Sequence, residues 1–237
     1  VQTCALPISD DVNEVGDDHT FTVTANKIIA GVEYPADDGT IVTVTLTDAN
    51  GAINDVSSDT CATGTVGGTC SVTFTSDTAG TVTGHAAANI AVLDEVFPVE
   101  TDGQGSNSDD AVKTFVDARI SITPDDTNEV GDDHTFTVSV EKNEGQGAGW
   151  VAADDGTLVT VSLTDSNGAA SSVSSDTCAT GTSGGSCSVT FSSNSAGTTV
   201  GHASANILSG GLDLFRETDG LAGNSGDATK IWVDAKI

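Results

Sequence analysis

Four cysteines stand at matched positions in the chain and could form two disulfide bonds. Eight residues separate Cys61 from Cys70, and the same spacing separates Cys178 from Cys187. After each second cysteine, residues alternate apolar and polar, which is typical of a half-buried strand. The C-x8-C spacing is wrong for a zinc ribbon or a thioredoxin-like motif. We therefore predict two disulfide hairpins, each closing a Gly-rich turn, in a protein from an oxidising compartment.

The four histidines also recur in pairs, which could indicate a metal site or a Ser-His-Asp arrangement. His19 and His134 each follow two aspartates in GDDHT, whereas His85 and His202 each lie in GHA. The cysteines are expected to be oxidised, so they supply no nucleophile, and GNSGD from Gly223 is interpreted as a turn. We expect surface or strand-edge histidines and no catalysis.

Acidic residues could bind calcium, which takes about six to eight oxygen ligands. Asp117, Asp125, Asp126 and Glu129 lie close in sequence near the predicted domain junction. No D-x-D-x-D-G loop accompanies them. We therefore predict no cofactor and keep calcium at these four residues as an alternative. A second acidic group occupies matched loops, at Asp102, Asp109, Asp110, Asp219 and Asp227.

A sugar-binding face would need exposed aromatic side chains. Tyr34 and Trp150 lie in the loop that differs most between the two halves of the chain, and they are the candidate ligand-binding residues. Phe115 and Trp232 are expected to point outward from the last strand of each half, where they could bind sugar or cover a sheet edge. The residues of that strand expected to face the core are Ile231, Val233, Ala235 and Ile237.

An internal repeat divides the chain into two tandem domains. Most matched positions lie 117 residues apart, as Cys61 and Cys178 do, but Asn13 and Asn128 lie 115 apart. The difference falls between residues 24 and 37, where KIIAGVEYP is replaced by KNEGQGAGWVA, and a polar loop tolerates such a change. The predicted domains, residues 9–118 and 119–237, have the common size of ~100–150 residues.

The two ends of the chain are interpreted separately. VQTCALPI at residues 1–8 matches the in-frame translation of a common sequencing adaptor, so we expect an artefact, and the first domain is expected to lack its opening strand. The alternative is a genuine strand with a free thiol at Cys4. Because Ile237 matches Ile120, where the second copy begins, we expect the chain to be a piece of a longer array.

Short alternating segments separated by turn signals predict an all-β fold. Within the second copy, residues 134–140 and 158–163 alternate most clearly, and Ser209-Gly210-Gly211 is expected to form a hairpin turn that leads to residues 212–217. Seven or more such strands with turns every ~8–12 residues favour a β-sandwich. The first copy ends at VDARI and runs into the second without Gly or Ser linker residues, which predicts stiffly connected neighbours.

The chain carries a net charge of −28, from 35 acidic and 7 basic residues. Nucleic acids and anionic membranes need clustered Lys and Arg, so neither is an expected partner. We interpret the acidic surface as a source of solubility, with binding of divalent cations as the alternative.

These patterns together resemble the bacterial immunoglobulin-like repeats of surface proteins and adhesins, in the invasin/intimin-like group. The resemblance is carried by DGTIVTVTLTDANG at residues 38–51 with DGTLVTVSLTDSNG at 155–168, and by SVTFTSDTAGTVTGHA at 71–86 with its partner from 188. It implies two tandem immunoglobulin-like β-sandwich domains of the kind that project a binding tip from a cell surface. Some members bind host receptors or calcium. The disulfides and an added hairpin within residues 92–110 depart from that pattern.

We therefore predict a non-catalytic structural and adhesion repeat of a secreted or surface-anchored extracellular protein, acting as a stiff spacer. One alternative is a module that binds glycan or a surface protein through the variable loop. Another is an accessory array of an extracellular enzyme. The expected partners are neighbouring repeats of the same chain, with a host or cell-surface ligand in the binding alternative, and no membrane insertion by this segment.

Overall fold

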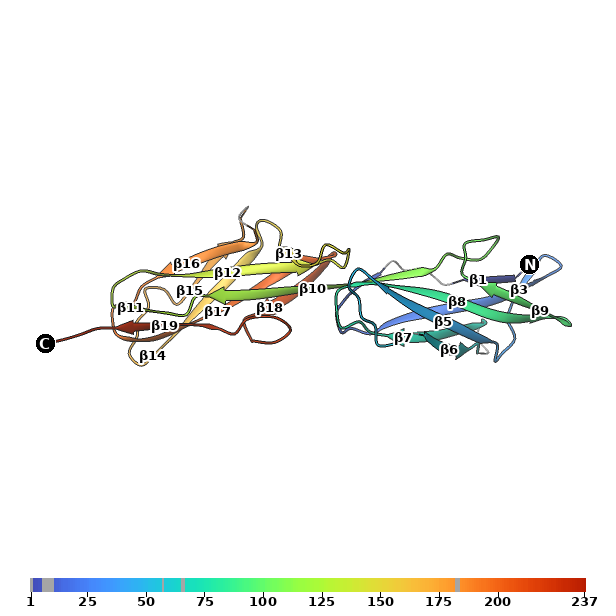
Figure 1. The fold of residues 1–237 in the computed structure, drawn as a ribbon, viewed down its shortest axis with the longest axis horizontal. Helices are drawn as coiled ribbons and strands as arrows, with labels where there is room; N and C mark the ends of the chain where they lie inside the picture. The colour runs from blue at the N-terminus through green and yellow to red at the C-terminus, as the bar shows by residue number, and fades with distance from the viewer. Residues whose placement is uncertain (1, 6–10, 57, 65–66, 182–183) are drawn as a thin grey trace. The chain divides into compact units, whose positions relative to one another are not determined.

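The protein is described by a computed structural model that covers residues 2–5, 11–56, 58–64, 67–181 and 184–237. These residues form strands and turns without a helix, as predicted (Figure 1). Among them, no helix is long and apolar enough to cross a membrane. The chain divides into two compact units. Unit 1 comprises residues 1–116 and 144–149, and unit 2 comprises residues 117–143 and 150–237.

Unit 1 contains two sheets. In the first, β3 pairs with β1 along one edge and with β7 and β4 along the other. In the second, the order is β2, β10, β8, β5, β6, and β9 also pairs with β8. The strands are β1 (Gln2–Ala5), β2 (Asp11–Glu14), β3 (His19–Ile29), β4 (Val32–Pro35), β5 (Ile41–Ala49), β6 (Ser58–Ala62), β7 (Thr69–Phe74), β8 (Gly80–Val92), β9 (Glu95–Glu100) and β10 (Ala111–Thr123).

Unit 2 repeats this arrangement. The second part of β10 pairs with β12, which pairs in turn with β16 and β13. The other sheet has the order β11, β19, β17, β14, β15, and β18 also pairs with β17. The strands that follow β10 are β11 (Asp126–Glu129), β12 (His134–Asn143), β13 (Val151–Ala152), β14 (Leu158–Ser166), β15 (Ser175–Ala179), β16 (Ser186–Phe191), β17 (Gly197–Ser209), β18 (Leu212–Glu217) and β19 (Ala228–Val233).

Each unit is an immunoglobulin-like β-sandwich, because two mainly antiparallel sheets enclose one apolar core. The alternation of side chains along each strand sends every second residue inward. On β12, this buries Phe136, Val138 and Val140. Phe136 also contacts Phe191 of β16, with their ring centroids 5.1 Å apart, so the few aromatic rings gather in the core.

The final strand faces the opposite way from the prediction. Ile231 is 45 % exposed, and Val233 is also exposed, whereas Trp232 is only 2 % exposed. Phe115, its match in unit 1, is fully buried. Alternation alone does not say which face is inward, and here the inward face carries one large ring and the apolar stem of Lys230. The residues after Val233 lie beyond the strand.

Of the hairpin predicted within residues 92–110, only β9 lies in that range, and it pairs with the preceding strand β8. The counterpart in unit 2 is the pairing of β18 with β17. The alternation of residues did not predict β11. Both β2 and β11 run parallel to the last strand of their unit, β10 and β19 respectively. This pairing brings an early strand of each repeat beside its last strand, as Figure 1 shows for β11 and β19.

Residues 2–5 form β1, which pairs with β3 through Cys4 opposite Ala25. In unit 2, the second part of β10 pairs with β12 as β1 pairs with β3 in unit 1, and Ile120 lies opposite Val140. The rest of residues 1–8 lies outside the described part of the chain. The origin of residues 1–8 in a sequencing adaptor stays a prediction. The expected loss of the first strand of the first domain stays a prediction as well.

Candidate functional site

Both predicted disulfide pairs form, but neither lies in a hairpin. Cys61 pairs with Cys70 and Cys178 with Cys187, with Cα atoms 5.6 and 5.7 Å apart. The first cysteine of each pair lies on a strand of one sheet, and the second lies on a strand of the other. Each disulfide therefore joins the two sheets of its sandwich. The hairpin prediction was wrong because β7 and β16 pair with β3 and β12, far away in sequence.

A second matched cluster lies where β11 runs beside β19. The register places Asp126 opposite Lys230 and Asn128 opposite Trp232. Because side chains two residues apart share a face, all four lie on one side of the strand pair. The Lys230 side chain is fully buried, and its Nζ donates a 2.6 Å hydrogen bond to Oδ1 of Asn128. The same Nζ lies 3.1 Å from Oδ2 of Asp126.

Unit 1 contains the same cluster. Its β2 runs parallel to β10, with Asp11 opposite Lys113 and Asn13 opposite Phe115. The Lys113 side chain is fully buried, with Nζ 2.7 Å from Oδ1 of Asn13 and 3.1 Å from Oδ2 of Asp11. We call these two sites the Lys-Asn-Asp clusters: Lys113, Asn13 and Asp11 in unit 1, and Lys230, Asn128 and Asp126 in unit 2.

Burial changes the protonation behaviour of the unit 1 cluster. Removal from water lowers the pKa of Lys113, because the charged ammonium is disfavoured away from solvent. The hydrogen bond from Lys113 lowers the pKa of Asp11, which stays ionised beside it. In unit 2, hydrogen bonds from the Thr127 N–H and from Lys230 lower the pKa of Asp126.

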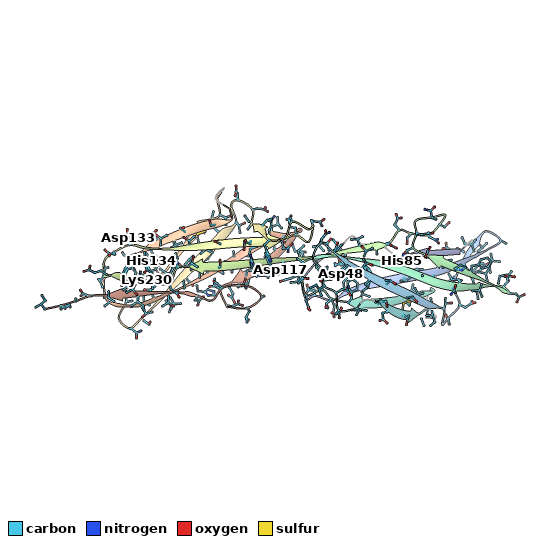
Figure 2. The ribbon with its side chains drawn as sticks, in the orientation of Figure 1. Asp48, His85, Asp117, Asp133, His134 and Lys230 are labelled. Carbon is cyan, nitrogen blue, oxygen red and sulfur yellow. A yellow bond between two sulfur atoms is a disulfide. The ribbon has the colours of Figure 1, made fainter. Side chains whose placement is uncertain are left out.

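His134 adds a buried ring near the unit 2 cluster (Figure 2). It is 5 % exposed, and its Nδ1 lies 3.8 Å from Oδ2 of Asp126. Its Nε2 has no hydrogen-bond partner within the part of the chain that the structure describes. The ring packs edge-on against Phe136, and burial followed by the charge of Lys230 lowers the pKa of His134. The expectation of a surface or strand-edge histidine was wrong for this residue, because Phe136 and Phe191 enclose the ring.

His85 and His202 secure loops. Nδ1 of His85 lies 2.8 Å from Oδ1 of Asp110, and Thr101 donates a 2.5 Å hydrogen bond to the same oxygen. In a Ser-His-Asp site, the hydroxyl and the carboxylate bind opposite nitrogens of the imidazole ring. Here Thr101 and Asp110 both lie on the Nδ1 side, so the geometry is that of a structural anchor. The matching group in unit 2 is His202, Asp227 and Thr218.

The structure does not bring the calcium candidates together. Asp117 pairs with Arg216 at 2.8 Å, Asp125 accepts a 2.6 Å hydrogen bond from the backbone of Thr229, and Asp126 belongs to the Lys-Asn-Asp cluster. Glu129 lies at the exposed end of β11. Among the described residues, no group of three or more His, Cys, Asp or Glu side chains could hold a metal ion.

The candidate ligand-binding aromatics lie in different units. Tyr34 is on β4 and is 45 % exposed. Trp150 is 36 % exposed, and the guanidinium carbon of Arg119 lies 4.3 Å from the centre of its ring. A cation over an indole face is a favourable contact that holds the ring in place. Phe115 and Trp232 lie in the cores, so they offer no sugar-binding surface.

Sequence reasoning missed one open cavity on unit 1. It lies along β5, β8 and β9, next to the loop that begins at Asp102. Its lining is partly apolar and partly polar and includes Ile41, Ala88, Val99, Glu100 and Asn107.

The similarities to known proteins come from solved structures. No protein-family model matches the chain, and no curated protein matches it. Among solved structures, it is similar to the Escherichia coli adhesin FdeC, with 17% sequence identity and a TM-score of 0.34, over 99% of this chain and 64% of that one. It is also similar to the D00-D0 domain of intimin, with 13% identity and a TM-score of 0.38, over 99% of this chain and 100% of that one. The chain thus spans about two thirds of the FdeC structure.

Proposed function

We propose that the chain is a pair of non-catalytic structural repeats, residues 9–118 and 119–237, that act as a stiff spacer in an extracellular adhesion protein. The observation that carries this proposal is the continuity of β10. Ala111–Val116 pairs with β8 and β2 of unit 1, and Asp117–Thr123 pairs with β12 of unit 2. No unpaired linker residue remains between the two halves of the strand, and a paired backbone bends less than a Gly-Ser linker.

The disulfides support a location in an oxidising compartment. Structural disulfides persist in secreted and surface proteins and are rare in the cytosol. One disulfide joins the two sheets in each unit, so both sandwiches carry the same cross-link. This shared feature supports secretion or display at a cell surface.

Spin labels at one exposed site in each unit test the spacer role. We expect a narrow distribution of label-to-label distances in the natural chain, because β10 allows little bending. A Gly-Ser segment inserted between Val116 and Asp117 is the control and should broaden the distribution. Equally broad distributions for the two proteins would argue against a stiff spacer.

A second candidate function is ligand binding through the variable loop. The observation that favours it is the exposure of Tyr34, and of Trp150 beside Arg119, in the segments that differ between the repeats. A glycan array probed with the natural chain and with Tyr34→Ala and Trp150→Ala tests it. Binding that is lost in one variant would favour a recognition module. An accessory array would instead require a catalytic domain elsewhere in the full protein.

A further inference from the structure

We propose that each unit is closed by an intramolecular isopeptide bond, between Lys113 and Asn13 in unit 1 and between Lys230 and Asn128 in unit 2. The bond would join Nζ of the lysine to Cγ of the asparagine and release ammonia. It adds a self-modification site to the protein, and it does not depend on the spacer role.

The reacting groups already lie side by side. In each unit the lysine side chain is fully buried, and its Nζ lies 2.7 or 2.6 Å from the amide oxygen of the asparagine. The amide carbon is bonded to that oxygen, so the amine is already beside the atom that it would attack. The parallel pairing of β2 with β10, and of β11 with β19, holds both partners in register.

A lysine that remains charged at this buried position costs free energy. A buried ammonium loses the hydration that it has in water, and a single half-exposed carboxylate compensates only in part. The pKa of Lys113 is lowered by this burial, which favours the neutral amine. A neutral amine is the nucleophilic form of lysine, and a neutral amide product removes the buried charge altogether.

A carboxylate beside each lysine can carry the proton. Asp11 and Asp126 each lie 3.1 Å from the lysine Nζ, close enough to take its proton directly. The same two-residue spacing, Asp-x-Asn, places the carboxylate and the amide on one face in both units. An amine, an amide and a carboxylate therefore lie together in each unit, with matching distances.

The reaction balances without a cofactor or an oxidant. In unit 2, the Lys230 ammonium passes a proton to Asp126, and the free amine forms a bond with Cγ of Asn128. The Cγ–Nδ2 bond then breaks as the second proton from Nζ reaches Nδ2. The departing nitrogen gains two protons in total through Asp126 and leaves as ammonium. The Asp126 carboxylate is regenerated, and the positive charge leaves with the ammonium ion.

The surroundings favour this outcome over hydrolysis of the amide. Trp232 covers the site from the core, with its ring centre 5.4 Å from Nζ of Lys230. Its Nε1 donates to Thr199 and so does not compete for the asparagine oxygen. His134 packs close to Asp126, and its lowered pKa keeps the ring neutral near the lysine. These groups exclude water while the amine remains in contact with the amide.

Intact mass spectrometry of the denatured, reduced full chain tests the proposal. We expect a mass lower than the sequence mass by two molecules of ammonia. Peptide mapping should find one branched peptide that joins Lys113 to Asn13 and another that joins Lys230 to Asn128. The full sequence mass would overturn the proposal.

Cyclisation at the Asn-Gly pairs also releases ammonia, so mapping must place the loss. These pairs are at Asn50 and Asn167. An ammonia loss confined to them, without branched peptides, would equally overturn the proposal.

Matched variants within one chain supply the internal control. Asn128→Ala should restore one ammonia mass and abolish the unit 2 branched peptide, while unit 1 still reacts. Asp126→Ala leaves both reacting groups in place and removes the proton carrier, so it should also restore one ammonia mass. A branched Lys230 peptide that persists in Asn128→Ala would contradict the assigned partner. One that forms as fast in Asp126→Ala as in the natural chain would contradict the role of the carboxylate.

Discussion

Trp232 and Phe115 are the large rings that the last strand of each unit contributes to its core. Trp232 packs against Phe191 with ring centroids 5.9 Å apart, and Phe115 packs against Phe74 at 6.1 Å. Aromatic side chains buried in this way supply much of the apolar contact in a small domain. Val, Ala and Ile fill the remaining core, so each ring carries a large share of the packing.

Truncating Trp232 should therefore be far more costly than truncating its neighbour. We expect Trp232→Ala to lower the free energy of unfolding of unit 2 by about 3–5 kcal/mol, as for other buried aromatics. Ile231→Ala, on the exposed face, is the control and should change it by about 0.5 kcal/mol or less. Urea denaturation followed by circular dichroism measures both. A larger loss of stability for Ile231→Ala than for Trp232→Ala would mean that Ile231, and not Trp232, faces the core.

His134 makes the stability of unit 2 depend on pH. Its pKa is lowered from 6.5 by burial, so the unfolded chain binds a proton more readily than the folded one. The contribution to stability is complete above about pH 6.5 and is lost as the pH falls through the lowered pKa. His134→Gln cannot take up this proton, so the fall in urea midpoint between about pH 7 and pH 5 should become shallower. An unchanged slope would contradict this role.

The disulfides act on whole elements, because each one ties β6 to β7 or β15 to β16 across the sandwich. The two cysteines of each pair are 9 positions apart, and closing so short a loop restricts the unfolded chain. By the loop-entropy estimate, one disulfide stabilises its unit by roughly 3 kcal/mol.

Removing one disulfide should leave the fold intact at lower stability. Cys178→Ala together with Cys187→Ala is expected to lower the free energy of unfolding of unit 2 by roughly 3 kcal/mol. Unit 1 keeps its disulfide and provides the reference within the same molecule. Differential scanning calorimetry of the variant, and of the natural chain under reducing agent, measures the change. If unit 2 is equally stable in the variant and in the natural chain without reducing agent, the bond between Cys178 and Cys187 does not stabilise the unit.

The whole molecule carries a net charge of −28, and like charges repel one another most strongly in the folded state. Dissolved salt screens this repulsion, with a Debye length of about 10 Å at 0.1 M ionic strength. Added sodium chloride should therefore raise the melting temperature by several degrees from its value in low salt.

Calcium should have no effect beyond that of ionic strength. The acidic residues proposed as ligands are bound to other groups or dispersed, so calcium and magnesium chlorides at matched ionic strength are expected to give the same melting temperature. Isothermal calorimetry at millimolar calcium should detect no binding heat. A heat of binding, or a fall in melting temperature with chelator, would show that a calcium site forms.

Local patterns in the sequence determined much of the architecture. The repeat, the strands marked by alternation, the pairing of Cys61 with Cys70 and the hairpin turn at Gly210 all depend on residues close together in the chain. Strands and tight turns produce sequence patterns that repeat over a few residues, so they can be recognised without knowledge of the fold. The resemblance to immunoglobulin-like surface repeats rested on the same short patterns.

Only the tertiary structure decided the inward face of β19, the pairing of the disulfide strands across two sheets, and the Lys-Asn-Asp clusters. Alternation is symmetric between the two faces of a strand, so burial of Trp232 and Lys230 could not be deduced from it. Lys113 and its partner Asn13 lie 100 positions apart, and nothing in their local sequence indicates contact. Such contacts form only when the first and last strands of a sandwich pair, which is a property of the complete fold.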